Sequence, residues 1–287
     1  MPDLTLPSQL AYAQELISSG DDTGAVAVCR RILSALPRCV QPYELLGQVM
    51  LRRDDPERAE SLYARVLSVD PQNARSILGM GLVHELRGAH GTAQAWMRSG
   101  AELGIDQDIT MAGWLRQAAA RIGQDSDRGL SRAGLAYMMM RAGMFRQAAA
   151  EFRSVLDECP SRADVAVALA EASYRTGDIS AAAEACEVLL EQLPDCLKAL
   201  LILGKLEMSA DADGRAREML RRAQSLDPEN RLAQRMFGGD SPLPPRSVRI
   251  PTAMGVEPLA LPYLRDAEDA DDRDDDEPLP GLLDILE

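Results

Sequence analysis

The sequence predicts an all-α fold built from repeated helix pairs, and three observations carry this prediction. Aromatic residues make up only 4% of the 287 residues, and few stretches are rich in β-branched residues, so the sequence gives little support to strands. Prolines return at intervals of 34 residues, and small residues return at the same two places of each interval. Repetition at this length indicates supersecondary units that stack on their neighbours, and about six such units fit the chain.

The prolines set the boundaries of the repeats. They are Pro37, Pro71, Pro160, Pro194 and Pro228. Every interval between them is 34 residues except the middle one, which is 89 residues and equals two periods plus 21. We therefore expect three repeats in residues 6–105, a spacer in residues 106–128, and three more repeats in residues 129–237, the last with a short capping helix.

Each period is interpreted as two helices joined by a tight turn. The first helix ends at a residue suited to a left-handed backbone: Gly20, Asp54, Gly88, Gly143, Gly177 and Asp211. Small residues stand five places later, in the second helix: Ala25, Ala59, Ala93, Ala148, Ala182 and Ala216. Others stand within the first helix: Ala13, Gly47, Gly81, Ala136, Ala170 and Gly204. We expect both sets at the contact inside each pair, where small side chains let two backbones approach closely.

This pattern resembles the tetratricopeptide repeat family, whose 34-residue motif has small residues at these two places, an aromatic residue in the second helix and a terminal proline. The resemblance covers about residues 6–105 and 129–230. The chain departs from the motif in three respects: Tyr43 alone keeps the aromatic residue near the start of the first helix, Ile105 replaces the proline of the third repeat, and a usually small place late in the second helix holds Ile32, Val66, Val155 and Leu189. The resemblance implies a right-handed α-solenoid that binds polypeptides.

The 21 additional residues fall in the spacer. An apolar stripe at helical spacing predicts an unpaired helix near residues 108–122, and the stripe consists of Met111, Trp114, Leu115, Ala118 and Ile122. Two interpretations stay open. The helix is either a spacer that keeps the core continuous, or a bend or docking helix that shapes the binding groove.

The last fifty residues differ in composition from the rest. Residues 238–287 contain eight of the seventeen prolines and carry −9 of the net charge of −14. Such a segment buries too little apolar area to offset the entropy of ordering, so we expect a disordered, acidic tail. Its terminal segment, LPGLLDILE, runs from Leu279 to Glu287 and combines apolar with acidic residues. It is interpreted either as a docking peptide or as chance apolar residues in a solubilising tail.

Charge and motif content exclude several classes of function. A net charge of −14 disfavours nucleic acids and anionic membranes as partners, and the sequence has no apolar run long enough to insert in a membrane. The chain start lacks the features of a secretory signal, so a cytoplasmic location is expected. The sequence has neither an HExxH nor a CxxC motif, and no phosphate-binding glycine loop. We therefore expect no enzyme activity, no cofactor and no metal.

The five cysteines are expected to be reduced thiols. Cys29 and Cys39 are ten residues apart, and so are Cys186 and Cys196. If most of each interval is helical, the two thiols of a pair lie about 12 Å apart, which is too far for a disulfide.

The resemblance to tetratricopeptide repeats also implies a concave binding face lined by the first helices. Carried over by repeat phase, the peptide-binding residues are Leu78, Leu82, Tyr137, Met140, Arg141, Tyr174, Arg175, Lys198, Leu201, Lys205 and Met208. In the second half, the tyrosine, leucine and methionine side chains would form an apolar floor, and the lysine and arginine side chains a charged rim. We expect such a groove to bind a short acidic and apolar peptide, and the terminal segment of the same chain has this chemistry. The alternative is that these are ordinary exposed side chains.

The resulting prediction for function is a protein-binding adaptor or scaffold, regulated by its own tail. Two other classes stay open. One is a structural component that associates with copies of itself, and the other is a regulatory subunit of an enzyme complex. The sequence identifies neither the partner nor the oligomeric state.

Overall fold

A computed structural model of the chain describes residues 5–104, 131–209 and 214–251. Six helix pairs dominate these ranges. The first array holds α1 (Leu6–Ser19) with α2 (Asp22–Ala35), α3 (Gln41–Arg52) with α4 (Pro56–Val69), and α5 (Ala74–Leu86) with α6 (His90–Glu102). The second array holds α8 (Arg132–Arg141) with α9 (Phe145–Glu158), α10 (Ala163–Thr176) with α11 (Ile179–Gln192), and α12 (Leu197–Ser209) with α13 (Arg215–Leu226). A short helix α14 (Arg231–Phe237) and a 3-10 turn η2 (Gly238–Asp240) follow.

Inside each pair, the small residues lie where the sequence predicts them. All of the predicted alanines and glycines of both sets are buried, which confirms the repeated contact between the two helices. The turn residues Gly20, Asp54, Gly88, Gly143 and Gly177 have positive φ values, as predicted, whereas Asp211 lies outside the described residues. The second helix of a pair begins at an aspartate cap in three repeats, where Asp21, Asp55 and Asp178 each accept a backbone N–H bond. The α-solenoid architecture is confirmed.

The side chain of Tyr63 shows how tightly these helices pack. Its ring is fully buried between a glycine of α3 and a glycine of α5. A Cβ atom added to Gly47 would lie 2.7 Å from Cε1 of Tyr63, and one added to Gly79 would lie 2.4 Å from Cε2. These glycines touch opposite edges of one ring, so the ring has no free side toward which it can shift.

Replacing Gly79 with alanine should therefore destabilise the fold. We expect Gly79→Ala to lower the free energy of unfolding by about 2 kcal/mol, because an added methyl group in a filled core forces side chains out of place. Gly91→Ala, on the exposed side of α6 with nothing near its added Cβ, is the matched control and should be neutral or gain up to about 1 kcal/mol in helix propensity. Urea unfolding followed by circular dichroism measures both. Equal stability of the two variants would show that the Tyr63 ring can shift to accommodate the added methyl group.

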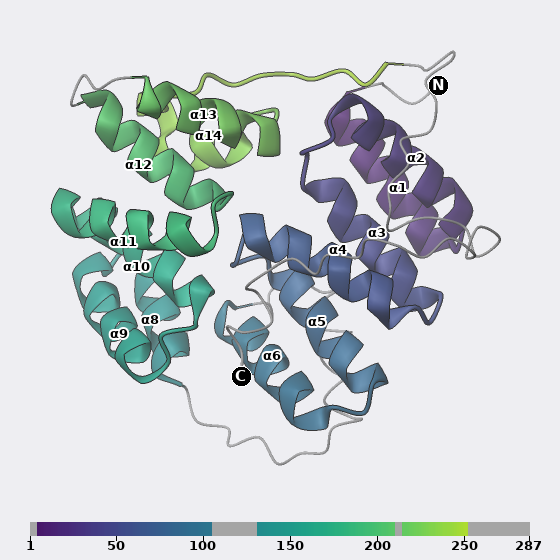
Figure 1. Ribbon diagram of the computed structural model, residues 1–287, viewed down its shortest axis with the longest axis horizontal. Coiled ribbons are helices and arrows are strands. Elements are labelled where there is room, and N and C mark those ends of the chain that lie inside the picture. Colours follow the sequence, from purple (N-terminus) through teal and green to yellow (C-terminus); the bar gives the residue numbers. More distant parts are fainter. Residues whose placement is uncertain (1–4, 105–130, 210–213, 252–287) are drawn as a thin grey trace.

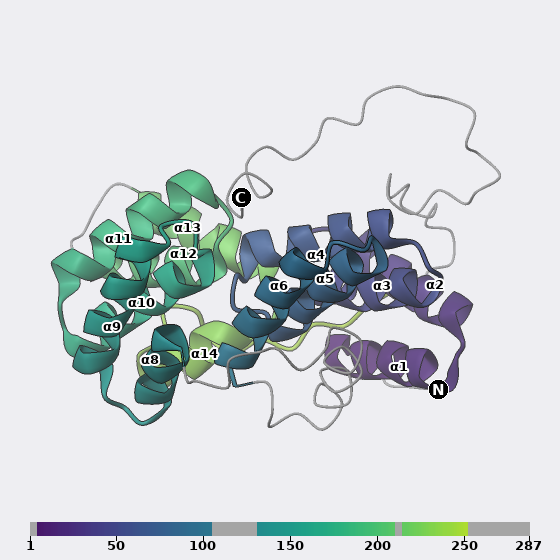
Figure 2. The ribbon, with the colours of Figure 1, turned by 90° about the horizontal axis from the view of Figure 1, so that it is seen from below.

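The two arrays face and contact each other across the molecule (Figures 1 and 2). The loop after α2 reaches the second array, where Arg38 forms an ion pair with Asp195 at 2.6 Å. The loop between α4 and α5 does the same, because Nε2 of Gln72 donates to the backbone oxygen of Asp164 at 3.0 Å. Val69 at the end of α4 belongs to the apolar core of the second array. The fold therefore holds the two arrays together through contacts that the loops after α2 and α4 make with the second array, in addition to the stacking of neighbouring pairs.

Part of the predicted disordered tail is ordered, which corrects the predicted start of the tail at residue 238. Residues 241–251, called the strap below, run from α14 across to α1 (Figure 1). The backbone N–H of Leu6 donates to the oxygen of Val248 at 2.8 Å, and Thr5 forms an isolated β-bridge with Arg249. Ile250 is 1% exposed within the core of the first array. The prediction failed because this short stretch adds its apolar residues to a core formed by other helices.

The other end of the strap is held by α14 and the loop before it. Nδ2 of Asn230 donates to the backbone oxygen of Pro244 at 2.6 Å, and Nε2 of Gln234 donates to that of Leu243 at 2.6 Å. Oε1 of Glu229 accepts the N–H of Val248 at 3.3 Å. The strap thus joins the last repeat to the first one.

The remaining expectations concern the spacer and the tail, the cysteines, and helices that could cross a membrane. The predicted spacer helix near residues 108–122 and the tail from residue 252 onward lie outside the described residues. Cys29, Cys39, Cys186 and Cys196 are buried free thiols, and burial raises the pKa of each to about 12. Among the described helices, none combines the length and apolar character needed to cross a membrane.

Candidate functional site

The structure divides the predicted groove residues between the core and the surface. Leu78, Tyr137 and Leu201 are at most 6% exposed, so they pack inside the arrays, and none of them lines either of the two cavities described below. Leu82 and Met140 are half-buried, whereas Met208 is exposed. Arg141 is exposed and donates to the backbone oxygen of Leu103 at 3.2 Å.

Tyr137 belongs to a buried polar cluster at the junction of α6, α8 and α10. Its hydroxyl donates to Oδ2 of Asp164 at 2.9 Å, and burial together with this carboxylate raises the pKa of Tyr137. The same carboxylate pairs with Arg162 at 2.8 Å, and Arg162 also pairs with Glu102 at 2.8 Å. Burial alone would lower the pKa of Arg162, but the hydrogen bonds and charges of Asp164 and Glu102 raise it above its ordinary value.

Two further groove residues contact α14, the last helix of the described residues. The ring of Phe237 in α14 meets the ring of Tyr174 edge-on, with centroids 5.4 Å apart. Nζ of Lys205 lies 5.6 Å from the centroid of the Phe237 ring and donates to the backbone oxygen of Asp240. The concave side of the second array is therefore partly occupied by α14 and η2.

Arg175 and Lys198 are the predicted residues that the structure brings together at one cavity. This cavity, called the central pocket, has a volume of about 360 Å³. Its lining comes from α10, α12, α14 and the loop between α4 and α5: Asp70, Gln72, Glu171, Arg175, Lys198, Leu232, Arg235 and Met236.

Hydrogen bonds and ion pairs connect the walls of the central pocket. Nζ of Lys198 lies 2.5 Å from Oε2 of Glu171 and 2.5 Å from Oε1 of Gln72, so it joins the second array to the first. Arg175 pairs more loosely with Glu171, at 3.5 Å. Arg235 forms no ion pair with any residue in the described ranges.

Cations outnumber carboxylates in this pocket. Arg175, Lys198 and Arg235 face Asp70 and Glu171. Burial raises the pKa of Asp70, although the charge of Lys198, a backbone hydrogen bond from Gln72 and the charge of Arg235 each act to lower it. The pocket is suited to a carboxylate group.

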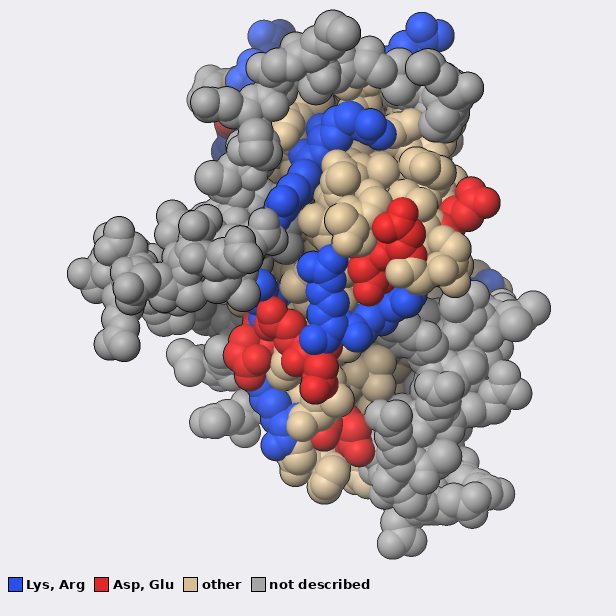
Figure 3. All heavy atoms as spheres, turned by 90° about the vertical axis from the view of Figure 1, so that its right-hand side faces the viewer, with Lys and Arg blue, Asp and Glu red and all other residues tan. Residues whose placement is uncertain are grey.

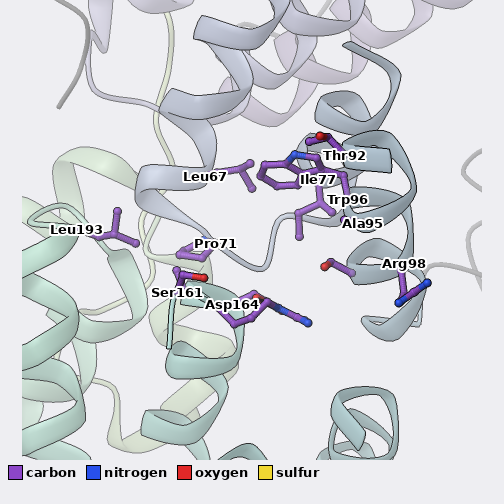
Figure 4. Close-up of a pocket in the computed structure, with 13 residues that line it drawn as sticks. Leu67, Pro71, Ile77, Thr92, Ala95, Trp96, Arg98, Ser161, Asp164 and Leu193 are labelled. Atoms are coloured by element: carbon purple, nitrogen blue, oxygen red, sulfur yellow. Dashed lines mark hydrogen bonds and ion pairs between the residues drawn. The ribbon is translucent and has the colours of Figure 1, made fainter. Parts of the chain in front are cut away.

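A second cavity lies between the arrays (Figure 4), and it shares a loop with the central pocket, because Pro71 lines this cavity whereas Asp70 and Gln72 line the central pocket. This seam pocket has a volume of about 240 Å³. Leu67, Pro71, Ile77 and Trp96 from the first array and Leu193 from the second form its apolar walls. Its remaining lining residues are Thr92, Ala95, Arg98, Ser99, Ser161, Arg162, Ala163 and Asp164.

Sequence reasoning missed most residues of both pockets. Gln72 and Lys198 are 126 residues apart, and no repeat-phase argument places a loop of the third repeat against a first helix of the sixth. The available signals were the polar residues Asp70, Gln72 and Asn73 and the basic residue Arg98, but each is an ordinary residue for a loop or a helix surface.

The outer side of the first array shows no such concentration of one charge. On the described part of that face, acidic and basic side chains lie next to one another, with apolar and neutral residues between them (Figure 3). Within residues 5–104, 131–209 and 214–251, no group of three or more His, Cys, Asp or Glu side chains is placed to hold a metal ion.

Comparison with known proteins bears on the repeats. Two sequence profiles, both described as tetratricopeptide repeat, match residues 45–107 and 139–206. No curated protein sequence matches the chain.

Solved structures with similar helix pairs include the TPR domain of P58(IPK), at 16% identity and a TM-score of 0.34, covering 79% of this chain and 61% of that one. The Cut9–Hcn1 hetero-tetramer of the APC/C matches at 15% identity and a TM-score of 0.36, covering 82% and 49%. A repeat protein from Parabacteroides merdae matches at 14% identity and a TM-score of 0.38, covering 80% and 96%. The chain thus spans less than two thirds of the first two proteins. No function follows from likenesses at these identities and TM-scores.

Proposed function

This chain is a tetratricopeptide repeat protein, and from that premise we propose that it is a scaffold that binds an acidic peptide segment of a partner protein in the central pocket. Proteins of this family are generally non-catalytic interaction modules. The observation that carries the proposal is the excess of cations in a pocket where both arrays and α14 meet. A cytoplasmic location is part of the proposal and is supported by the buried free thiols, which are typical of reducing compartments.

The pocket residues have distinct roles in this proposal. Arg235 has no ion-pair partner in the described ranges, so it can receive a carboxylate in a bidentate pair without losing an existing one. Lys198 and Arg175 both pair with Glu171, so these three side chains together leave one net positive charge beside Arg235. Leu232 and Met236 give the ligand an apolar contact on the side of α14.

The proposal also includes regulation by the chain's own tail. Residues 266–277, DAEDADDRDDDE, have the chemistry expected of the partner segment. Because they belong to the same chain, their effective concentration near the pocket is of the order of millimolar. An external acidic segment must therefore compete with them.

A direct binding measurement tests the central pocket. The probe is a fluorescent peptide with the sequence of residues 266–277, and the protein is the chain ending at Pro251, which keeps the strap and lacks the competing tail. We expect Arg235→Gln to weaken binding about tenfold, since the loss of one charge-assisted hydrogen-bond partner costs about 1.5 kcal/mol. Fluorescence anisotropy at low and high salt gives the dissociation constants.

The matched control is Arg231→Gln, one turn earlier in α14. Arg231 pairs with Glu229, does not line the central pocket, and carries the same charge. We expect it to bind as tightly as the unaltered protein. If both variants bind the peptide equally well, or if the unaltered chain ending at Pro251 does not bind it, the proposed site is wrong.

A further inference from the structure

We propose that the seam pocket holds the terminal segment, residues 279–287, of the same chain. The inference rests on the proposed function in one respect: with the terminal segment docked here, the preceding acidic residues 266–277 would lie near the central pocket, which is lined from the same loop at residues 70–72. The seam pocket differs from the central pocket in chemistry, because its walls are mainly apolar. It therefore suits the part of the tail that is rich in leucine and isoleucine.

The walls come from both arrays, so the occupant contacts both. Leu67 and Ile77 face Trp96 on the side of the first array, and Pro71 and Leu193 lie on the opposite side (Figure 4). Trp96 is only half-buried although it is the largest side chain of the lining. An aromatic ring left partly exposed beside apolar neighbours gains stabilisation when apolar side chains cover it.

The charged residues at the rim of the seam pocket indicate which charge the occupant should carry. Arg162 is committed to Glu102 and Asp164, both at 2.8 Å. Arg98 is exposed and forms no ion pair within the described residues. The seam pocket thus combines apolar walls with one cation available for an acidic group.

The terminal segment has the complementary composition. Leu282, Leu283, Ile285 and Leu286 supply apolar side chains, while Asp284 and Glu287 supply carboxylates. A helical turn would put several of the apolar side chains on one side, next to an acidic one. A carboxylate of this segment would pair with Arg98 while the apolar side chains cover Trp96.

Chain length permits this docking without a second copy. The described part ends at Pro251, and residues 252–278 separate it from the terminal segment. A chain of 27 residues without regular structure has an end-to-end distance of roughly 30 Å, comparable with the size of a compact domain. Binding within one chain therefore benefits from an effective concentration of the order of millimolar.

Trp96 provides the readout. The chain has two tryptophans, so Trp114→Phe leaves Trp96 as the only one. In this background we compare the full chain with one that ends at Pro278. We expect removal of residues 279–287 to shift the Trp96 emission to longer wavelength and to increase its quenching by acrylamide about twofold. Millimolar LPGLLDILE peptide should reverse both changes. Identical emission and quenching in the two chains would overturn the proposal.

A second experiment avoids the tryptophan substitution. Calorimetric titration of the same peptide into the chain ending at Pro278, with both tryptophans present, should show one binding site per chain. Ala95→Phe fills the pocket mouth and should abolish this binding, whereas Ala101→Phe, on the exposed surface of the same helix outside the pocket, should not. No binding to the unaltered chain, or equal binding to both variants, would contradict the assignment.

Two further results separate this inference from the proposed function. Arg235→Gln should leave the Trp96 signal unchanged, because that residue lines the central pocket alone. The full chain should sediment as a monomer over a concentration series with Trp96 protected throughout. A dimer in which protection of Trp96 rises with concentration would overturn docking within one chain.

Discussion

Arg162→Met should lower the free energy of unfolding by about 4 kcal/mol, the largest effect expected of a single substitution in this chain. The guanidinium group is 18% exposed and neutralises two carboxylates, Glu102 at 8% and Asp164 at 9% exposure. Methionine fills a similar volume but leaves both carboxylates buried without a cation. The loss should therefore come from uncompensated charge and much less from packing. Urea unfolding monitored by circular dichroism measures it.

Two comparisons isolate this cause. Arg38→Met removes an ion pair between the arrays whose side chains are 42% and 38% exposed, and it should cost less than about 1 kcal/mol. Adding Glu102→Gln to Arg162→Met removes one of the stranded charges and should recover part of the lost stability. If Arg162→Met is no more harmful than Arg38→Met, the buried cluster does not hold the arrays together.

Ile250→Ala should lower the free energy of unfolding by about 3 kcal/mol, because a fully buried isoleucine would be replaced by a cavity. This residue lies beyond the last repeat, yet its side chain is part of the core formed by the first repeats. The effect therefore measures how strongly the strap is anchored on the first array. Thermal and urea unfolding both provide the value, and Ser247→Ala, at an exposed position of the strap, is the control that should be neutral.

Truncation tests the same contact on a larger scale. A chain ending at Asp240 lacks the whole strap, whereas one ending at Pro251 keeps it. We expect the shorter chain to be less stable and to have a larger radius of gyration in small-angle X-ray scattering, because the last and first repeats lose their direct connection. If the two chains have the same radius and the same stability, the strap does not contribute to the arrangement of the arrays.

The repeats were predictable because they depend on local rules. Positive φ at Gly20 and Asp54, and a second helix that ends just before Pro37 and Pro71, follow from residue types at fixed spacing. Burial of the small residues follows from the same period. Each of these features concerns a helix and its neighbour, so a single period contains the information needed.

The site depended on contacts that no single period contains. Tyr137 has the phase of a groove residue, but its hydroxyl instead bonds to Asp164 inside the protein. Lys205 has the same phase and contacts Phe237 of α14 and Asp240 of η2. The position of a residue within its repeat predicts which face of the helix it lies on. It does not predict which distant segments of the chain pack against that face.

The bridge between Thr5 and Arg249 brings the first and last described stretches of the chain side by side. Whatever is attached before Thr5 or after Pro251 consequently leaves the protein from one edge. A domain fused before Thr5 and another fused directly after Pro251, in place of residues 252–287, would therefore be attached side by side. For a scaffold, this geometry would make the chain a connector that delivers two attached bodies to a common place.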